Sequence, residues 1–295
     1  MGTGFLSLWD LISNTLRNTF ETEFNKLIDN IFHIVYGENY KSIKQKRDLG
    51  SDGIIEPEKV SIACYAPESY DAKKFKKKIR EDYEKFRENY AKLGYLFRFI
   101  TNIKLLGSII TYFKELCPDG DIWGLEEIIS FIKKQPPKIR RYVLIDVFNI
   151  PEEFIRYDII EEIIYEIDKL NETLDNTTVI AYSPPTGLLK KIEINFKNGN
   201  FREYLIRLIE ESYPEYGFFL NEIFKSMEPE EISTLKTKVL NRTATLYLEK
   251  ESFEEVFSAL IDDFSSKYPD DDEYRKHVIM LLIYIFEQCI IGRRT

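Results

Sequence analysis

The 295-residue sequence is poor in the residues that most often build metal and nucleophilic sites, with two histidines and three cysteines. Cys64, Cys117 and Cys289 are far apart and include no Cys-x-x-Cys pair, which excludes a disulfide framework and a local thiolate zinc site. His33 and His277 lie in apolar patterns typical of helices, which favours a packing role. The sequence therefore disfavours histidine catalysis and a two-histidine metal site.

Long hydrophobic runs are also lacking. The longest, Val278–Phe286, has nine residues, whereas a membrane-spanning helix needs about 20. The first residues show no basic segment followed by an apolar stretch, so we expect a cytoplasmic protein without a membrane partner. Phosphate-loop, nucleophile-elbow and dinucleotide-binding glycine motifs are absent from the sequence, so nothing in it supports those three chemistries.

Charge is present in both signs but is unevenly distributed. The net charge of −9 argues against a protein that coats nucleic acid with its whole surface. Residues 38–80 nevertheless contain eleven basic and seven acidic residues, a local net charge of +4 that leaves −13 for the remainder. This segment is the candidate for contact with phosphates.

Hydrophobic periodicity in the first half indicates alternating helices and strands. Residues 8–35 form a helical pattern, either one helix or a broken pair, and Gly94 ends a second long helical pattern. We expect strands at 41–47, 59–65, 95–100 and 121–123, a turn at 48–53, and helices at 72–92, 105–116 and 125–133.

The second half is predicted to be mostly helical. Pro136 and Pro137 mark a boundary, a helix is expected at 159–170, and residues 175–199 are an irregular linker around a strand candidate at 190–196. Beyond residue 200 the pattern is helical, with breaks expected near Pro214, Pro229 and Pro269. Because residues 278–286 are apolar on every side, their helix should be buried all round.

These patterns predict an α/β fold with a small mixed sheet flanked by helices, followed by a mostly helical C-terminal domain. The expected organisation is an α/β domain at 1–135, a helical and irregular connector at 136–199, and a helical interaction domain at 200–295.

The order of acidic residues and strands suggests a divalent-metal site for phosphodiester hydrolysis. Such a site places carboxylates on a helix and in a loop, beside a strand with an oxygen ligand and a lysine. The chain offers Glu21 and Glu23 on a helix and Asp52 in the turn before a strand. The following strand has Ala63 and Tyr65 where the ligand and the lysine should be.

Three segments resemble the N-terminal region of many bacterial defence proteins, which are similar to degenerate PD-(D/E)XK nucleases. They are Gly50-Ser-Asp-Gly-Ile-Ile55, Ser61-Ile-Ala-Cys-Tyr-Ala-Pro67 and Phe97-Arg-Phe-Ile-Thr-Asn102. Residues Tyr274–Arg293 resemble the closing helix of C-terminal domains in ABC-three-component systems, whose proteins are encoded beside an ATPase. The resemblance implies a restriction-endonuclease-like core and a helical tail that contacts partners.

The resemblance also assigns residues. Asp52 would be the metal-binding and catalytic aspartate, Glu23 the helix carboxylate, and Mg²⁺ the metal if the site is active. Ala63 replaces the glutamine of the family pattern, which argues against metal binding and cleavage. Lys73, Lys76 and Lys77 are candidates for nucleic-acid binding, or for a lysine that has migrated into the site from the following helix.

Simpler interpretations remain for each of these residues. Asp52-Gly53 is a common turn pair, Glu23 is one of several carboxylates on a solvated helix face, and the lysines can be a solvated surface. Three functions therefore stay open: a defence protein that binds DNA or a partner ATPase, an active metal-dependent DNA endonuclease, and a protein-binding adaptor. Oligomerisation is compatible with each. The nuclease-like core requires the strands near Ile43, Ile62 and Phe97 to share one sheet.

Overall fold

The computed structural model describes residues 7–43, 50–170, 187–197, 199–288 and 291. The chain divides into two compact units, Met1–Ile155 and Arg156–Thr295. The boundary between the two units falls within residues 136–199, the connector expected from the sequence. Much of the linker expected at 175–199 lies outside the described residues.

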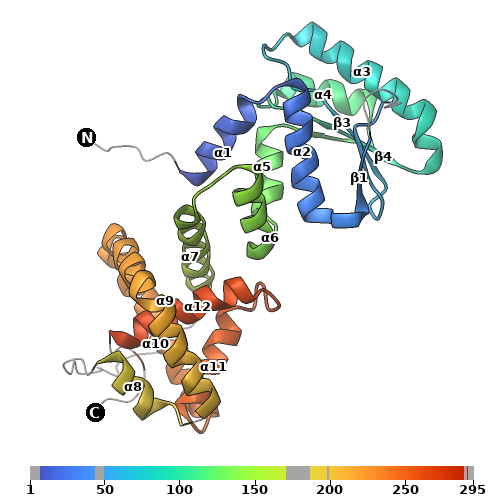
Figure 1. Cartoon of the computed structure of the whole chain (residues 1–295). Helices are drawn as coiled ribbons and strands as arrows, with labels where there is room; N and C mark the ends of the chain where they lie inside the picture. The colour runs from blue at the N-terminus through green and yellow to red at the C-terminus, as the bar shows by residue number, and fades with distance from the viewer. Residues whose placement is uncertain (1–6, 44–49, 171–186, 198, 289–290, 292–295) are drawn as a thin grey trace, which may run out of the picture. The chain divides into compact units, whose positions relative to one another are not determined.

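Unit 1 is built on a five-stranded mixed sheet in the order β1-β2-β3-β4-β5. Figure 1 labels three of these strands, β1, β3 and β4. The strands β1, β2 and β3 are antiparallel neighbours, whereas β4 and β5 continue the sheet in parallel with β3. Their bounds are β1 Tyr40–Ser42, β2 Gly53–Ile55, β3 Val60–Cys64, β4 Leu96–Ile100 and β5 Asp121–Trp123. The expected α/β class with a mixed sheet is therefore confirmed.

The helices of unit 1 begin with a broken pair, one of the two forms expected for residues 8–35. The bounds are α1 Leu8–Arg17, α2 Glu21–Tyr36, α3 Ala72–Asn89, α4 Gly107–Leu116, α5 Leu125–Lys133 and α6 Pro137–Tyr142. Short 3-10 turns follow α2 at Gly37–Asn39 and α3 at Ala91–Leu93, and a π-helical turn, Val143–Val147, follows α6. Gly94 ends the α3 region in a left-handed conformation, φ +79°.

Alternating side chains of β4 divide the core of unit 1 between the two faces of the sheet. On one face, Phe97 and Phe99 pack in a buried cluster with Phe75 of α3 and Phe113 of α4. On the other face, Arg98 lies over the Trp123 ring, 4.1 Å from its centroid. Trp123 in turn contacts aromatic rings of α2 and α5. The sheet therefore separates α3 and α4 from α2 and α5.

The strands near Ile43, Ile62 and Phe97 do share this sheet, with α3 packed on it. Ile43 directly follows β1, and its N–H donates to the carbonyl oxygen of Asp52 at 2.8 Å. The rest of the strand expected at 41–47 lies outside the described residues. The strand β2 was assigned to the turn and the residues after it, because three residues are too few to display an alternating pattern.

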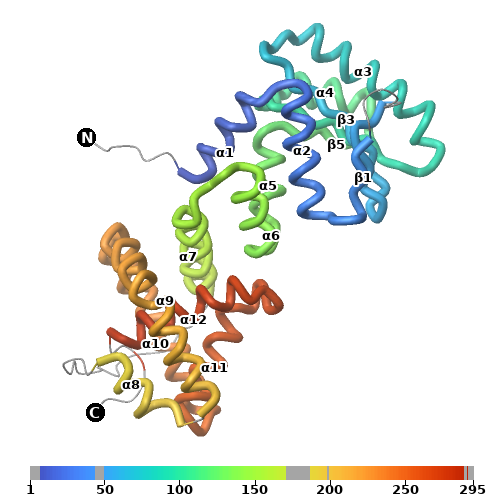
Figure 2. Tube along the Cα trace, viewed as in Figure 1, coloured from blue at the N-terminus to red at the C-terminus, as the bar shows by residue number. Residues whose placement is uncertain are grey.

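All the regular secondary structure in the described residues of unit 2 is helical. Its helices are α7 Glu152–Asp168, which begins in the last residues of unit 1, α8 Leu188–Asn195, α9 Gly199–Ser226, α10 Pro229–Glu249, α11 Phe253–Phe264 and α12 Asp272–Glu287. The α12 helix packs against α9 and α11 (Figure 2), and every residue from Val278 to Phe286 is buried. The prediction of a helix buried all round is confirmed.

Two predictions for this region were wrong. Residues 190–195 lie in the α8 helix rather than in a strand. The alternation of Ile192 and Ile194 misled the assignment, since so short a pattern does not distinguish the two structures. The α9 helix also continues through Pro214, where a break was expected. Buried Tyr213 and Tyr216 on either side hold this helix in the unit 2 core, which outweighs the local cost of the proline.

No helix in the described part of the chain has the length and apolar character needed to cross a membrane.

Candidate functional site

The turn before β2 is fixed tightly against α3. Gly50 adopts φ +88°, and a Cβ atom there would lie 2.6 Å from the Cβ of Lys85 and 2.9 Å from the carbonyl oxygen of Asp82. The buried Ser51 hydroxyl donates to the Gly53 carbonyl oxygen at 2.9 Å. Only glycine fits at position 50 without backbone strain or a collision with α3. The close approach of the turn to α3 places Asp52 beside both β3 and α3.

Both carboxylate oxygens of Asp52 accept hydrogen bonds. The backbone N–H of Cys64 donates to Oδ2 at 2.7 Å, and Nδ2 of Asn25 donates to Oδ1 at 3.3 Å. The backbone N–H of Asp52 donates to the Ile62 carbonyl oxygen at 2.6 Å. Asp52 therefore connects α2, its own turn and β3.

Asp52 lines a pocket of about 270 Å³ at this junction, called the Asp52 pocket below. Residues from α2, the 50–52 turn, β3 and α3 contribute to it. They are Asn25, Gly50, Ser51, Asp52, Ala63, Cys64, Lys78 and Asp82.

The α3 helix supplies an ion pair to this pocket. Lys78 Nζ lies 2.7 Å from Asp82 Oδ1, and the two residues are four positions apart on one helix face. Asp82 is 3% exposed, whereas the Lys78 side chain is 35% exposed. Lys78 is the cationic residue that lines this pocket within the described part of the chain.

The three lysines singled out from the sequence lie outside the Asp52 pocket. Lys73 and Lys77 are exposed, and Lys77 pairs with Glu81 at 3.6 Å. Lys76 lies over the Tyr112 ring, 4.9 Å from its centroid. Sequence reasoning missed Lys78, although its spacing from Asp82 and the buried positions Phe75 and Ile79 could have indicated it.

Glu23 also lies outside the pocket. Its side chain is 71% exposed and pairs with Lys26 at 2.7 Å. Asn25, two residues further along α2, is the residue of that helix that reaches Asp52.

Negative charge is concentrated around the pocket. Burial raises the pKa of the Cys64 thiol well above its usual value, and the charges of Asp52, Asp29 and Asp82 raise it further. Burial likewise raises the pKa of Tyr40. The hydrogen bond that its hydroxyl donates to Asp29 raises this pKa further. The Cys64 thiol therefore stays protonated at neutral pH, which makes it a poor nucleophile and metal ligand.

The donor set does not fit Mg²⁺, which the resemblance implies. Magnesium requires several oxygen ligands in near-octahedral geometry, usually including one or two carboxylates. Here Asp52 already accepts two hydrogen bonds, Asp82 is paired with Lys78, and Ala63 offers no ligand. Across the described residues, no three histidine, cysteine, aspartate or glutamate side chains are grouped so that they could hold a metal ion.

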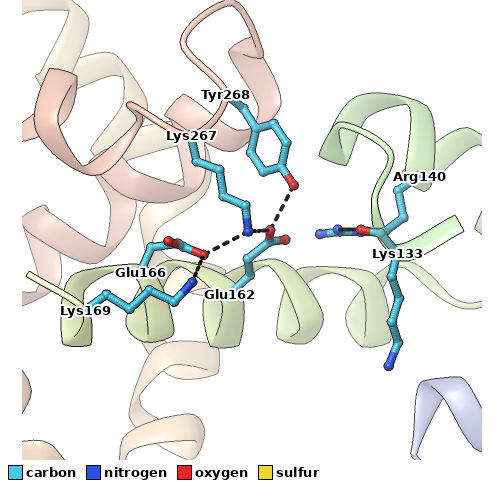
Figure 3. A network of polar contacts seen from close by, with 7 residues as sticks. All are labelled: Lys133, Arg140, Glu162, Glu166, Lys169, Lys267 and Tyr268. Carbon is cyan, nitrogen blue, oxygen red and sulfur yellow. Dashed lines mark hydrogen bonds and ion pairs between the residues drawn. The ribbon is translucent and has the colours of Figure 1, made fainter. Parts of the chain in front are cut away.

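A second polar network lies in unit 2 (Figure 3). Lys267 Nζ lies 2.7 Å from Glu162 Oε1 and 2.8 Å from Glu166 Oε1, and the Tyr268 hydroxyl donates to Glu162 at 3.0 Å. Partial burial lowers the pKa of Lys267, but the bonds to both glutamates outweigh it and raise the pKa above its usual value. These contacts hold the turn after α11 against α7, so we assign the network a structural role.

Comparisons of the chain with protein-family models, curated proteins and solved structures found no match.

Proposed function

We propose that the protein is a cytoplasmic bacterial defence protein whose unit 1 is a degenerate nuclease-like domain. In this proposal it binds DNA or a partner ATPase and does not cut efficiently. The observation that carries the proposal is the Asp52 pocket, where an aspartate stands at the start of β2 beside a strand that presents Ala63.

The order of elements supports the nuclease-like part of the proposal. A helix, α2, precedes three antiparallel strands, and α3 then leads to the parallel strand β4. The segments that carry the resemblance contribute β2, β3 and β4, and they lie next to one another in the sheet. The resemblance to PD-(D/E)XK nucleases places the metal-binding aspartate and the ligand-bearing strand together, as Asp52 and β3 are here.

The chemistry of the Asp52 pocket supports binding over cleavage. Asp52 accepts hydrogen bonds from Asn25 and from the Cys64 N–H, and Asp82, the α3 carboxylate that lines the pocket, is in an ion pair. A hydrolytic centre needs a metal or a general base to activate water. Neither role is available to Ala63.

The exposed basic face of α3 supports contact with nucleic acid. Lys73, Lys74, Lys77 and Arg80 are exposed on this helix. Lysines that neutralise phosphates release counterions, so the affinity they provide is salt dependent and insensitive to sequence.

One observation favours the second candidate, an active metal-dependent DNA endonuclease. Lys78 comes from the helix after β3 and lines the same pocket as Asp52 and Asp82. In that candidate, it would be the migrated lysine that positions the attacking water. A protein-binding adaptor without a nucleic-acid role is the third candidate.

Fluorescence anisotropy of a labelled DNA duplex in EDTA tests the proposal. We expect the full chain to bind without metal, with an affinity that falls as salt rises. Lys73→Ala/Lys77→Ala should bind several-fold more weakly, with a salt slope smaller by about 2, since each lost phosphate contact contributes about 0.9.

The matched control is Lys92→Ala/Lys134→Ala, which removes the same charge from exposed positions outside α3. It should bind like the wild type. Equal loss in both variants would mean that general charge, not α3, attracts the DNA. No binding to duplex or single-stranded DNA at low salt would reject the DNA role and leave the partner protein.

A further inference from the structure

We infer that the ammonium group of Lys78 takes the place of a divalent cation in the Asp52 pocket and keeps such cations out. This inference deepens the proposed function and rests on it, because it concerns the same pocket. It explains how two aspartates are tolerated in one pocket at the junction of α2, β3 and α3.

The helix geometry brings the cation to the acidic group. Lys78 and Asp82 are separated by four residues, and Lys78 Nζ lies 2.7 Å from Asp82 Oδ1. Asp82 occupies the inner face of α3, between buried Ile79 and Phe86. The ion pair is therefore a fixed part of the α3–sheet interface, unlike the exposed pair of Lys77 with Glu81.

The ion pair between Lys78 and Asp82 balances a buried negative charge. A buried carboxylate without a compensating charge or hydrogen bond is strongly unfavourable. Asp52 accepts hydrogen bonds from Asn25 and from the Cys64 N–H, and Asp82 receives a full positive charge from Lys78. Lys78 lines the same pocket as both aspartates, so its ammonium would repel a divalent cation that bound between them.

The size of the pocket does not exclude an ion. Its volume of about 270 Å³ greatly exceeds the roughly 30 Å³ that one water molecule occupies in the liquid. The Lys78 ammonium adds an electrostatic barrier to the lack of a ligand at Ala63, and removing its charge should let the carboxylates of Asp52 and Asp82 hold a hard cation.

Titration of the full chain with Mn²⁺, followed by the loss of the free-ion signal in electron paramagnetic resonance, tests this inference. The wild type should show no saturable site. Lys78→Met, which keeps the aliphatic stem, should gain one saturable site that binds Mn²⁺ at least about tenfold more tightly than the weak, unsaturable binding of the wild type, a difference of about 1.4 kcal/mol. Lys77→Met is the matched control and should behave like the wild type.

A further substitution, Asp82→Asn in the Lys78→Met background, should remove the gained site. Saturable binding by the wild type, or a folded Lys78→Met variant without a gained site, would overturn the inference. If Lys78→Met does not fold, the Lys78→Met/Asp82→Asn double variant decides. Recovery of folding supports charge compensation by Lys78, and continued failure contradicts it.

DNA binding in EDTA, measured on the same samples, separates this inference from the proposed function. Gained Mn²⁺ binding in Lys78→Met with no DNA binding by any variant would reject the proposed DNA role and keep the role of Lys78. DNA binding with no gained Mn²⁺ site in Lys78→Met would keep the proposed DNA role and reject the role of Lys78.

Discussion

Asp52 joins several elements of unit 1 through one residue. Its carboxylate accepts from Asn25 of α2 and from the N–H of Cys64 in β3, and its carbonyl oxygen accepts from the N–H of Ile43 beside β1. Such contacts give Asp52 a structural role even without a metal. Asp52 therefore contributes to the architecture of unit 1 independently of any chemistry in the pocket.

Gly50 should be the least replaceable residue of the adjoining turn. Gly50→Ala would force φ +88° on a residue with a side chain and drive its Cβ to 2.9 Å from the Phe86 nitrogen. We expect a loss of about 2–4 kcal/mol in the free energy of unfolding, measured by urea denaturation.

The control for this change is Gly94→Ala. Gly94 has a similar φ of +79°, but its Cβ would meet nothing within 4 Å. Gly94→Ala should lower the free energy of unfolding only by the cost of a left-handed backbone at alanine, about 1 kcal/mol. Equal losses at the two glycines would show that the turn does not press against α3.

The sequence was enough to find Asp52 as a site candidate but not its neighbours. The turn residues and the following apolar strand mark Asp52 by local pattern alone. Lys78 stands in a run of lysines, and its four-residue spacing from Asp82 was the sequence signal that would have separated it from the others. Asn25 was missed because its role depends on where α2 meets β2 in space.

Among the elements, α7 shows how unit 2 uses charge at its surface. Glu162 and Glu166 lie one turn apart on α7 and share Lys267, while Lys169 also pairs with Glu166 at 3.0 Å (Figure 3). Burial alone would raise the pKa of Glu166, but the bonds from Lys267 and Lys169 lower it below its usual value. The network therefore stabilises unit 2 when the glutamate is ionised.

The stability provided by this network should depend on pH in a defined direction. Because the folded-state pKa of Glu166 is lowered, its contribution is present above the ordinary value of 4.5 and is lost as the pH falls through the folded value. Lys267→Met should lower the free energy of unfolding by about 1 kcal/mol at neutral pH. The difference from the wild type should shrink below pH 4.5.

Urea denaturation at a series of pH values measures this difference. Lys225→Met is the control, since Lys225 pairs only with exposed Glu222 among the contacts described for it, and it should change stability little at any pH. A loss in Lys267→Met that stayed constant from neutral to acidic pH would contradict an ionic role for the network.

Helices with long, regular apolar patterns were predictable from the sequence. A short helix, and a helix in which packing offsets the cost of a proline, were not. The α3 and α12 helices follow from their apolar spacing and from the glycine and proline that bound them. The α8 helix was mistaken for a strand, because tertiary burial of Ile192 and Phe196 settles its structure. Pro214 was read as a break, although packing on both sides keeps α9 continuous.

For the whole molecule, the distribution of charge limits how nucleic acid could be bound. The chain carries −9 overall, while residues 38–80 carry +4. A net negative protein repels DNA at long range, so binding has to be local and strengthened at low salt. The sequence predicted this asymmetry directly, and the structure places part of it on the exposed side of α3.

Cleavage of DNA by the isolated full chain tests the central claim, that the Asp52 pocket belongs to a nuclease-like domain that does not cut. Labelled duplex and single-stranded DNA are incubated with Mg²⁺ or Mn²⁺, and products are resolved by gel electrophoresis beside an Asp52→Ala variant. We expect the DNA to remain intact with both proteins, because the residues around Asp52 do not fit a metal. Robust cleavage by the wild type that Asp52→Ala abolishes would contradict the claim and establish an active centre.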